Sequence, residues 1–264
     1  MKSKYQPFDF DKSLSRIDNI LYNSATYEEA DRIPNVDDLS YSNGKYVKCA
    51  AFFIDLRGST DLIKIQGRKP KTLARLYRAY ISEILAIVNS FETCEEVNIV
   101  GDCVSAMFSG KRETSETPVI EAMQAASMSN AMMDVLNVKY QKKWGESFKE
   151  IKAGIGIALG RALVIKAGFS GSGIKELIYM GDVVNRASKM CGLANNVKEF
   201  TSPICVTEDV YNSVGKYIAN SSTNSTFQDF LTKRYHEKHG VVYTGKFIRS
   251  KIHNWANEQS KSTV

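Results

Sequence analysis

The sequence lacks the features that mark secreted, membrane and zinc-binding proteins. Its five cysteines are odd in number and widely spaced, with no CxxC pair, so neither a disulfide framework nor a zinc knuckle is indicated, and we expect buried free thiols. No stretch approaches the roughly 18 apolar residues of a membrane span, and the amino-terminal region has no apolar core of a secretory signal. We therefore expect a cytoplasmic protein that does not bind membranes.

Blocks of positive charge and the common phosphate-binding glycine motifs are also missing. The net charge is +6, but the Lys and Arg residues are spread along the chain, so we do not predict nucleic-acid binding. The glycine-rich stretch 160–175 matches neither GxGxxG after a strand nor GxxxxGK[ST], and we interpret it as a flexible arm or loop. The positive balance suits a small polyanionic ligand instead.

Hydrophobic periodicity predicts an α+β domain. Apolar runs indicate strands at 47–56, 97–100, 104–108, 151–158, 177–180 and 241–248. Helical spacing indicates helices at 71–91, at 117–140 and from 182 to 191, with a short helix after 207. This order predicts a mainly antiparallel sheet with helices covering one face. We place an amino-terminal extension at 1–45, a catalytic domain at 46–250 and a polar tail at 251–264.

Two apolar segments end on an aspartate beside a glycine turn. Asp55 lies in FIDLRGST, and Asp102 ends VNIVGD. If the two strands pair side by side, their carboxylates form a site for hard divalent cations, which prefer oxygen ligands and often complete their shell with substrate phosphates. The backbone amides of Leu56 to Thr60 follow at an expected helix start, where phosphate oxygens bind. The pair therefore predicts a nucleoside triphosphate substrate, and the alternative is a capping aspartate and a turn aspartate without a ligand.

A third segment, YMGDVVNRASKM at 179–190, carries two further polar candidates. Asn185 and Lys189 are four residues apart and therefore lie on one face of a helix. An amide and an ammonium placed together can hold a ribose and a phosphate whose charge grows in the transition state. Polar pairs at this spacing are common on exposed helices, so this segment alone does not identify a site.

Together the three segments resemble the catalytic domain of the class III nucleotidyl cyclases. The family motifs are F-x-D-[IL]-x-G-[FS]-T, a G-D on a hairpin, and G-D-x-V-N-x-A-S-[RK], and matches extend from about Val47 to Thr207. The resemblance implies a ferredoxin-like α+β domain that pairs head to tail as a homodimer, with each active site built from both protomers. It also implies two Mg²⁺ or Mn²⁺ ions per site, attack of the ribose 3′-hydroxyl on the α-phosphate, and release of pyrophosphate.

The resemblance assigns roles to residues by their position in the motifs. Asp55 and Asp102 are metal ligands, and the Leu56 carbonyl is a further ligand. Asn185 orients the ribose, and Lys189 takes the place of the family's transition-state arginine. A lysine there is a departure, because an ammonium cannot make the paired contacts of a guanidinium.

The loop after Asp55 is assigned to the triphosphate. Its residues are Arg57, Gly58, Ser59 and Thr60. Arg57 is an unusual charge in such a loop, and we expect it either to contact the triphosphate or to face solvent.

The two positions that read the base differ from those of the purine cyclases. Adenylate cyclases usually carry Lys, and Asp or Thr, at these positions, and guanylate cyclases carry Glu and Cys; this chain has Asn98 and Ile178. Unpaired buried polar groups are costly, so replacing both readers is expected to change the base. The bulky side chain of Ile178 is expected to narrow the base-binding pocket and to favour a base with a single ring.

This pattern is similar to that of the pyrimidine cyclases of Pycsar antiphage defence. Those enzymes make cyclic UMP or cyclic CMP, which activates a separate effector protein. The sequence leaves UTP and CTP open as substrates, because the amide of Asn98 can read either base in one of its two orientations.

Three alternative functions are also compatible with parts of the sequence. The first is an adenylate cyclase with atypical base-selecting residues. The second is a catalytically silent cyclase-like domain that binds nucleotide or a partner protein, and the presence of both metal aspartates and Asn185 argues against it. The third, a nucleic-acid-binding module, rests on the net charge alone.

Overall fold

The structure is a computed structural model that describes residues 5, 7–59, 70–110, 114, 116–145, 148–169, 175–220 and 223–261. Among the described residues, nine strands form one sheet, with the main path β10-β11-β7-β5-β2-β4-β3, β1 paired to β2 and β6 paired to β5. The strands are β1 (Thr26–Ala30), β2 (Asn43–Arg57), β3 (Cys94–Val100), β4 (Cys103–Ser109), β5 (Lys152–Gly168), β6 (Lys175–Met180), β7 (Ile204–Thr207), β10 (Leu231–His236) and β11 (Gly240–Gly245). Among these described strands, only the β1–β2 and β5–β7 pairings are parallel, so the predicted α+β class with a mainly antiparallel sheet is confirmed.

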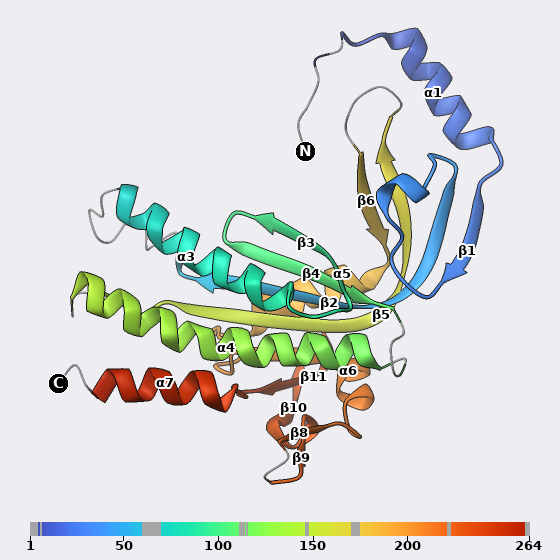
Figure 1. The fold of residues 1–264 in the computed structure, drawn as a ribbon. Coiled ribbons are helices and arrows are strands. Elements are labelled where there is room, and N and C mark those ends of the chain that lie inside the picture. The colour runs from blue at the N-terminus through green and yellow to red at the C-terminus, as the bar shows by residue number, and fades with distance from the viewer. Residues whose placement is uncertain are drawn as a thin grey trace.

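The helices and the smaller elements complete this frame (Figure 1). The α-helices are α1 (Phe10–Tyr22), α3 (Pro70–Val88), α4 (Thr117–Trp144), α5 (Asp182–Leu193), α6 (Glu208–Ser213) and α7 (Ser250–Lys261). The remaining elements are η1 (Val36–Asp38), η2 (Gln228–Phe230) and a separate hairpin of β8 (Ile218–Asn220) and β9 (Ser225–Thr226). Pro70 begins α3, where its missing N–H costs no hydrogen bond, and Gly145, with φ of +81°, ends α4.

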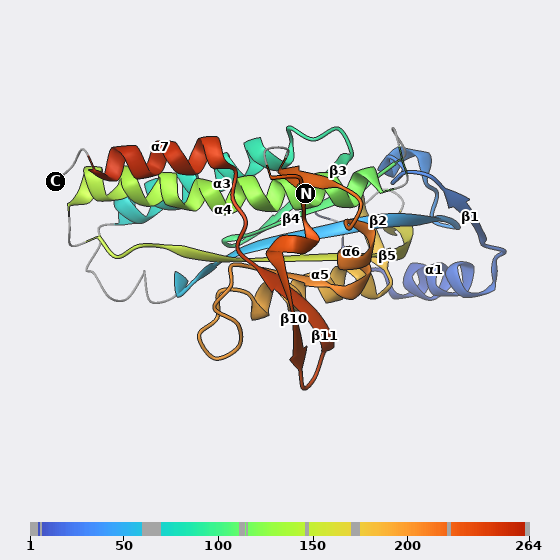
Figure 2. The ribbon, with the colours of Figure 1, turned by 90° about the horizontal axis from the view of Figure 1, so that it is seen from below.

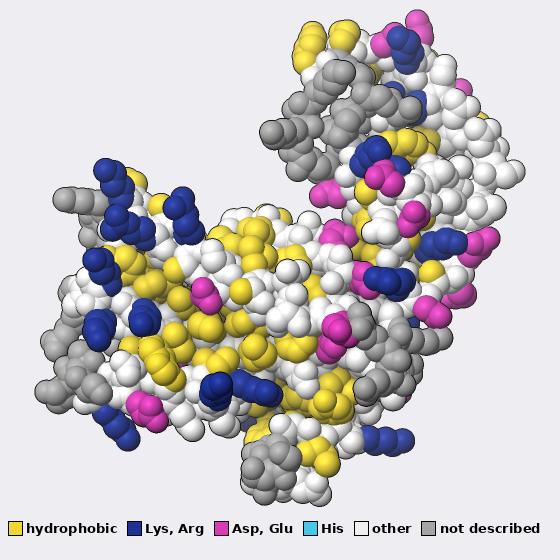
Figure 3. All heavy atoms as spheres, viewed as in Figure 1, with side chains coloured by type: hydrophobic (Ala, Val, Ile, Leu, Met, Phe, Trp, Pro, Cys, Tyr) yellow, Lys and Arg dark blue, Asp and Glu magenta, His cyan; other side chains and the backbone are white. Residues whose placement is uncertain are grey.

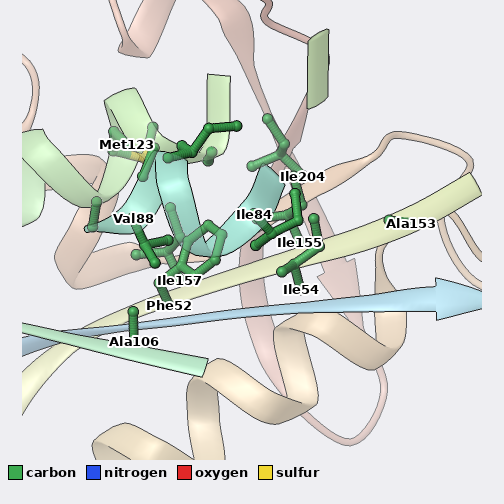
Figure 4. Close-up of a cluster of buried hydrophobic side chains, with 14 of the residues drawn as sticks. Phe52, Ile54, Ile84, Val88, Ala106, Met123, Ala153, Ile155, Ile157 and Ile204 are labelled. Carbon is green, nitrogen blue, oxygen red and sulfur yellow. The ribbon is translucent and has the colours of Figure 1, made fainter. Parts of the chain in front are cut away.

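The central strand β2 alternates its side chains between two packed faces. Phe52 and Ile54 point into the layer of α3 and α4, where they pack in one cluster with Ile84 and Met123 (Figure 4). Cys49 and its odd-numbered neighbours lie in a different cluster, which includes residues of α5. Figure 2 shows α5 on the opposite side of the sheet from α3, α4 and α7. Helices therefore cover both faces, whereas the sequence analysis places them on one.

Glycines of β5 explain why α5 can lie on this second face. A Cβ atom on Gly156 would lie 2.0 Å from the backbone nitrogen of Cys191, and one on Gly160 would lie 3.1 Å from the Cβ atom of Val183. The helix thus rests on strand backbone that carries no side chain. Gly160 belongs to β5, which continues to Gly168, so the predicted arm or loop at 160–175 is wrong for its first nine residues.

Both ends of the chain contain elements that the sequence analysis does not predict. β1 lies parallel to the first residues of β2, while none of the residues of α1 is buried. α7 packs along α4 (Figure 1), and the His253 ring contacts Asp134 across this interface at 2.8 Å. The division into an extension, a domain and a tail stays a prediction. Within the described ranges, every helix is too short or too polar to cross a membrane.

Candidate active site

Asp55 and Asp102 lie close together at one end of the sheet. Asp55 is the third residue from the end of β2, and the pairing of Ile54 with Val104 brings it beside the start of β4. Asp102 lies in the two-residue turn between β3 and β4, where Gly101 has φ of +64° and needs no Cβ. Burial raises the pKa of Asp55, and the nearby Asp102 carboxylate raises it further. The structure therefore brings the two predicted metal ligands together.

One oxygen of Asp102 is available to a ligand. Its Oδ2 atom is buried, and no described residue donates a hydrogen bond to it. Such atoms are rare in folded proteins because the lost hydration is costly. Two adjacent carboxylates, one with a buried unpaired oxygen, fit a hard divalent cation such as Mg²⁺ or Mn²⁺. No group of three or more His, Cys, Asp or Glu side chains suited to a metal occurs in the described part, so other oxygens must complete the shell.

Arg57 joins Asp55 to the end of α5. Its Nη1 donates to Asp55 Oδ2 at 3.2 Å, its Nε donates to the carbonyl of Ala194 at 3.0 Å, and its Nη2 donates to the carbonyl of Cys191. The guanidinium therefore satisfies carbonyls at the carboxyl end of α5, which have no partner within the helix. A Cβ atom on Gly154 would lie 1.8 Å from Nη2, so this arrangement requires glycine at that position.

The contacts of Arg57 also concern the loop that the sequence assigns to the triphosphate. All three nitrogens of the Arg57 guanidinium have protein partners, and contact with a triphosphate stays a prediction. β2 continues through Arg57, with Leu56 opposite Ala153, so the strand is longer than predicted. Gly58, with φ of +67°, forms the turn after β2, and Ser59 is helical. Thr60 lies outside the described residues.

Sequence reasoning missed two tyrosines of α3 that lie near the carboxylates. Burial raises the pKa of Tyr77, and so does the nearby charge of Asp102, while a hydrogen bond with the Ser59 side chain lowers it. Tyr80 is fully buried, and its hydroxyl has no hydrogen-bond partner among the described residues. Burial, followed by the charge of Asp55, raises its pKa. Helical spacing predicts that both residues face the core. No sequence signal indicates that their hydroxyls reach the acidic end of β2.

The predicted base readers Asn98 and Ile178 are placed on different surfaces. Asn98 is exposed on β3, and its Nδ2 atom donates to Glu96 Oε1 at 2.8 Å. The other oxygen of Glu96 accepts from the hydroxyl of Tyr179 on β6. Side chains alternate along a strand, so Ile178 points away from the face of Tyr179, and it is 45% exposed. The structure thus places Tyr179, not Ile178, next to the side chain that holds Asn98.

Asn185 and Lys189 are both exposed on α5. Val183, Ala187 and Met190 form the buried side of this helix, so the predicted ribose and phosphate contacts face away from the sheet. Among the described residues, no hydrogen bond or ion pair links Asn185 or Lys189 to Asp55 or Asp102. The structure confirms that Asn185 and Lys189 share a helix face but does not bring them to the two aspartates of the same chain.

Comparisons with known proteins identify the family and the fold. The model of the adenylate and guanylate cyclase catalytic domain matches residues 42–230. A uridylate cyclase of Gulbenkiania mobilis is 67% identical over 98% of this chain and 99% of its own length, and a uridylate cyclase of Treponema porcinum is 30% identical over 95% and 82%. The crystal structure of the adenylyl cyclase CyaB from P. aeruginosa has the same fold, with a TM-score of 0.61 and 19% identity over 78% of this chain and 97% of that one. The chain therefore belongs to the adenylate and guanylate cyclase catalytic domain family.

Proposed function

We propose that this protein converts UTP to 3′,5′-cyclic UMP and pyrophosphate. The observation that carries the proposal is the pair of Asp55 and Asp102, with the Oδ2 atom of Asp102 buried and without a hydrogen-bond donor among the described residues. The choice of a pyrimidine is supported by the two uridylate cyclases to which the chain is 67% and 30% identical. Asn98, in place of the Lys or Glu of purine cyclases, is consistent with that choice.

The reaction requires a nucleophile and a leaving group that are held in line. Asp55 and Asp102 would hold two Mg²⁺ or Mn²⁺ ions, whose Lewis acidity would lower the pKa of the ribose 3′-hydroxyl and offset charge on the phosphates. Arg57 holds Asp55 in place through the 3.2 Å contact with its Oδ2 atom. Asn185 orients the ribose, and Lys189 places positive charge near the phosphate in the transition state.

The exposed positions of Asn185 and Lys189 support a site built from two chains. Neither residue contacts Asp55 or Asp102 within the described part of one protomer, and both face outward on α5. A head-to-tail homodimer would bring these residues of one protomer to the two aspartates of its partner, and a two-fold axis would repeat the site. Sedimentation at micromolar concentration should give a dimer.

Incubation with each of the four labelled nucleoside triphosphates, in Mg²⁺ or Mn²⁺, tests the proposal. We expect cyclic UMP as the main product, and removal of the metal with EDTA should stop pyrophosphate release. A dominant cyclic AMP product would instead establish an adenylate cyclase with atypical base-selecting residues. No pyrophosphate release from any of the four would favour a silent nucleotide-binding domain.

The cellular role is a separate part of the proposal. The resemblance to the Pycsar pyrimidine cyclases supports a cytoplasmic enzyme whose product activates a separate effector protein during phage infection. Cyclic UMP should then rise in infected cells that carry the wild-type protein and stay at baseline in cells that carry Asp102→Asn. Equal levels in the two strains would contradict this role.

A further inference from the structure

Two residues beside Asn98 hold its amide in one orientation. Asn98 Nδ2 donates to Glu96 Oε1 at 2.8 Å, and the Tyr179 hydroxyl donates to Glu96 Oε2. Glu96 and Asn98 are two apart on β3 and share a face of the strand, while Tyr179 comes from β6. Each oxygen of the Glu96 carboxylate therefore has a donor, and the three side chains form one chain of hydrogen bonds.

The chemistry of a carboxylate determines which way the amide points. A carboxylate accepts hydrogen bonds and does not donate them. If the Asn98 amide turned over, its Oδ1 atom would face Glu96 Oε1, and two acceptors would repel each other. The Nδ2 side is therefore directed to Glu96, which leaves Oδ1 and the second N–H of the amide for a ligand. Tyr179 stabilises this orientation of the Asn98 amide, because its hydroxyl holds the Glu96 carboxylate in position.

We propose that Glu96 and Tyr179 are positioning residues that make Asn98 read the N3–H of uracil, and that this arrangement selects UTP over CTP. The inference rests on the proposed function and deepens it by separating the two pyrimidines. Without Glu96 the amide could adopt either orientation and serve either base, as the sequence alone allows. With Glu96 in place, the orientation that directs Nδ2 to the carboxylate is favoured, because the other places two acceptors opposite each other.

The two bases differ in the groups that they present at this edge. Uracil has a donor at N3 between two carbonyls, whereas cytosine has an acceptor at N3 with an amino group on one side. An Oδ1 atom held opposite N3 is attracted to uracil and repelled by cytosine. In uracil, the remaining N–H of Asn98 can donate to the carbonyl at C2 or to the carbonyl at C4, which flank N3. In cytosine, it can donate only to the carbonyl at C2, because C4 carries an amino group. The held amide therefore favours uracil whichever side of N3 its N–H faces.

The side of β6 that carries Tyr179 adds support. Tyr179 lies opposite Val164, and both belong to the cluster on the α5 face of the sheet. Burial raises the pKa of Tyr179, and the hydrogen bond to Glu96 raises it further, so the phenol keeps its proton and remains a donor near neutral pH. The group that holds Glu96 is therefore a stable part of the folded protein.

The decisive experiment compares kcat/KM for UTP and CTP in the wild-type protein and in Glu96→Gln. A glutamine side chain can donate as well as accept, so it allows the Asn98 amide to turn over. We expect the UTP/CTP ratio to fall about tenfold to a hundredfold, because one unsatisfied polar contact no longer penalises CTP. Turnover of CTP should rise, a gain that loss of structure would not produce. Tyr179→Phe keeps the ring and should lower the ratio by about two- to fivefold.

Glu95→Gln is the matched control, because it makes the same change at the next position of β3. Glu95 pairs with Arg32 at 2.9 Å, and in the described part of the chain the Asn98 amide donates to Glu96, so the ratio should stay at the wild-type value. An unchanged ratio in both Glu96→Gln and Tyr179→Phe, with thermal unfolding like that of the wild type, would overturn the inference alone. A wild-type enzyme that uses CTP as well as UTP would also overturn it. A wild-type protein that cyclises neither would overturn the proposed function together with the inference.

Discussion

The two faces of the sheet share the strand β2, but they differ in what they bury. On the face of α3 and α4, Phe52 and Ile54 are fully buried in a continuous apolar cluster, and the helices expose further apolar side chains on their outer surface (Figure 3). On the α5 face, β2 passes from buried Cys49 and Ala51 to partly exposed Asp55 and Arg57 within a few residues. One face is buried and apolar from Ala50 to Leu56, and the other ends in charge over the same stretch.

This difference shows how one strand can carry residues for stability on one face and residues for catalysis on the other. Successive side chains point to opposite faces, so neighbouring positions such as Ile54 and Asp55 belong to different environments. Substitutions on the α3–α4 face should lower stability and leave the rate of the folded enzyme unchanged. Substitutions at the charged end of the α5 face should do the reverse. The predictions below test that separation.

The largest effect is expected from Asp102→Asn. It removes one of two metal-binding charges, so turnover of UTP should fall by at least about a thousandfold. Thermal unfolding should stay at or above the wild-type midpoint, because the variant removes a buried, unpaired charge beside Asp55. Asp134→Asn, on α4 next to His253, is the control with normal turnover. Turnover of Asp102→Asn within tenfold of wild type would refute the metal assignment.

Phe52→Ala should be the largest change in stability. It leaves a cavity under α3 and α4 and should lower the free energy of unfolding by about 3–5 kcal/mol, as measured by urea denaturation. The rate per folded molecule should remain near that of wild type at a temperature where the variant is folded. Tyr235→Ala, at a position that is 76% exposed, serves as the aromatic control. A large loss of rate in folded Phe52→Ala would break the separation between the faces.

Arg57→Ala should affect both quantities, because the side chain joins the two functions. The Ala194 and Cys191 carbonyls lose their donor, which should lower the free energy of unfolding by about 1–3 kcal/mol. Asp55 also loses its cationic partner, and turnover should fall. Arg57→Lys should recover part of one contact only, since an ammonium cannot reach Asp55 and both carbonyls at once. Arg32→Ala, which removes a largely exposed side chain, should change neither quantity by a comparable amount.

The smallest effect concerns the thiols beneath α5. Burial raises the pKa of Cys49 and Cys205 to about 12, so both bind their protons more tightly in the folded state. Their contribution to stability is therefore complete below pH 9 and is lost as the pH rises from about 9 towards 12. At pH 10 the loss should be about 1 kcal/mol for each thiol. The double variant Cys49→Ala with Cys205→Ala should show a shallower fall in thermal midpoint between pH 8 and 10, and an identical slope would argue that water reaches this face.

The sequence predicts most of the fold near the three motifs and less of it elsewhere. Apolar runs and helical spacing locate β2, α3, the β3–β4 hairpin, α4 and α5 to within a few residues. The length of β5 is missed because its glycines suggest a loop, whereas they are there to let α5 approach. α7 and β1 are missed because their sequences are polar, and their positions depend on contacts with distant parts of the chain.

The site is predictable in its acidic pair and not in its supporting contacts. Glycine turns and apolar strands indicate Asp55 and Asp102 directly. The partners of Arg57 lie 134 and 137 residues further along the chain, and the contact of Tyr179 with Glu96 spans 83 residues. Local patterns carry no information about such pairs. The motif position indicates Ile178 as a base reader, which stays a prediction, while strand alternation directs Tyr179 and not Ile178 to Glu96.

The alternation of β2 also limits how this protein can change. Deleting a single residue between Ala51 and Ile54 would exchange inside and outside for every later position of the strand. Asp55 would then move to the buried position of Ile54, and Leu56 would take the place of Asp55 at the open end of the sheet. A point substitution in β2 can change one face of the strand without changing the other. An insertion or deletion here would disrupt the apolar core and the acidic site together.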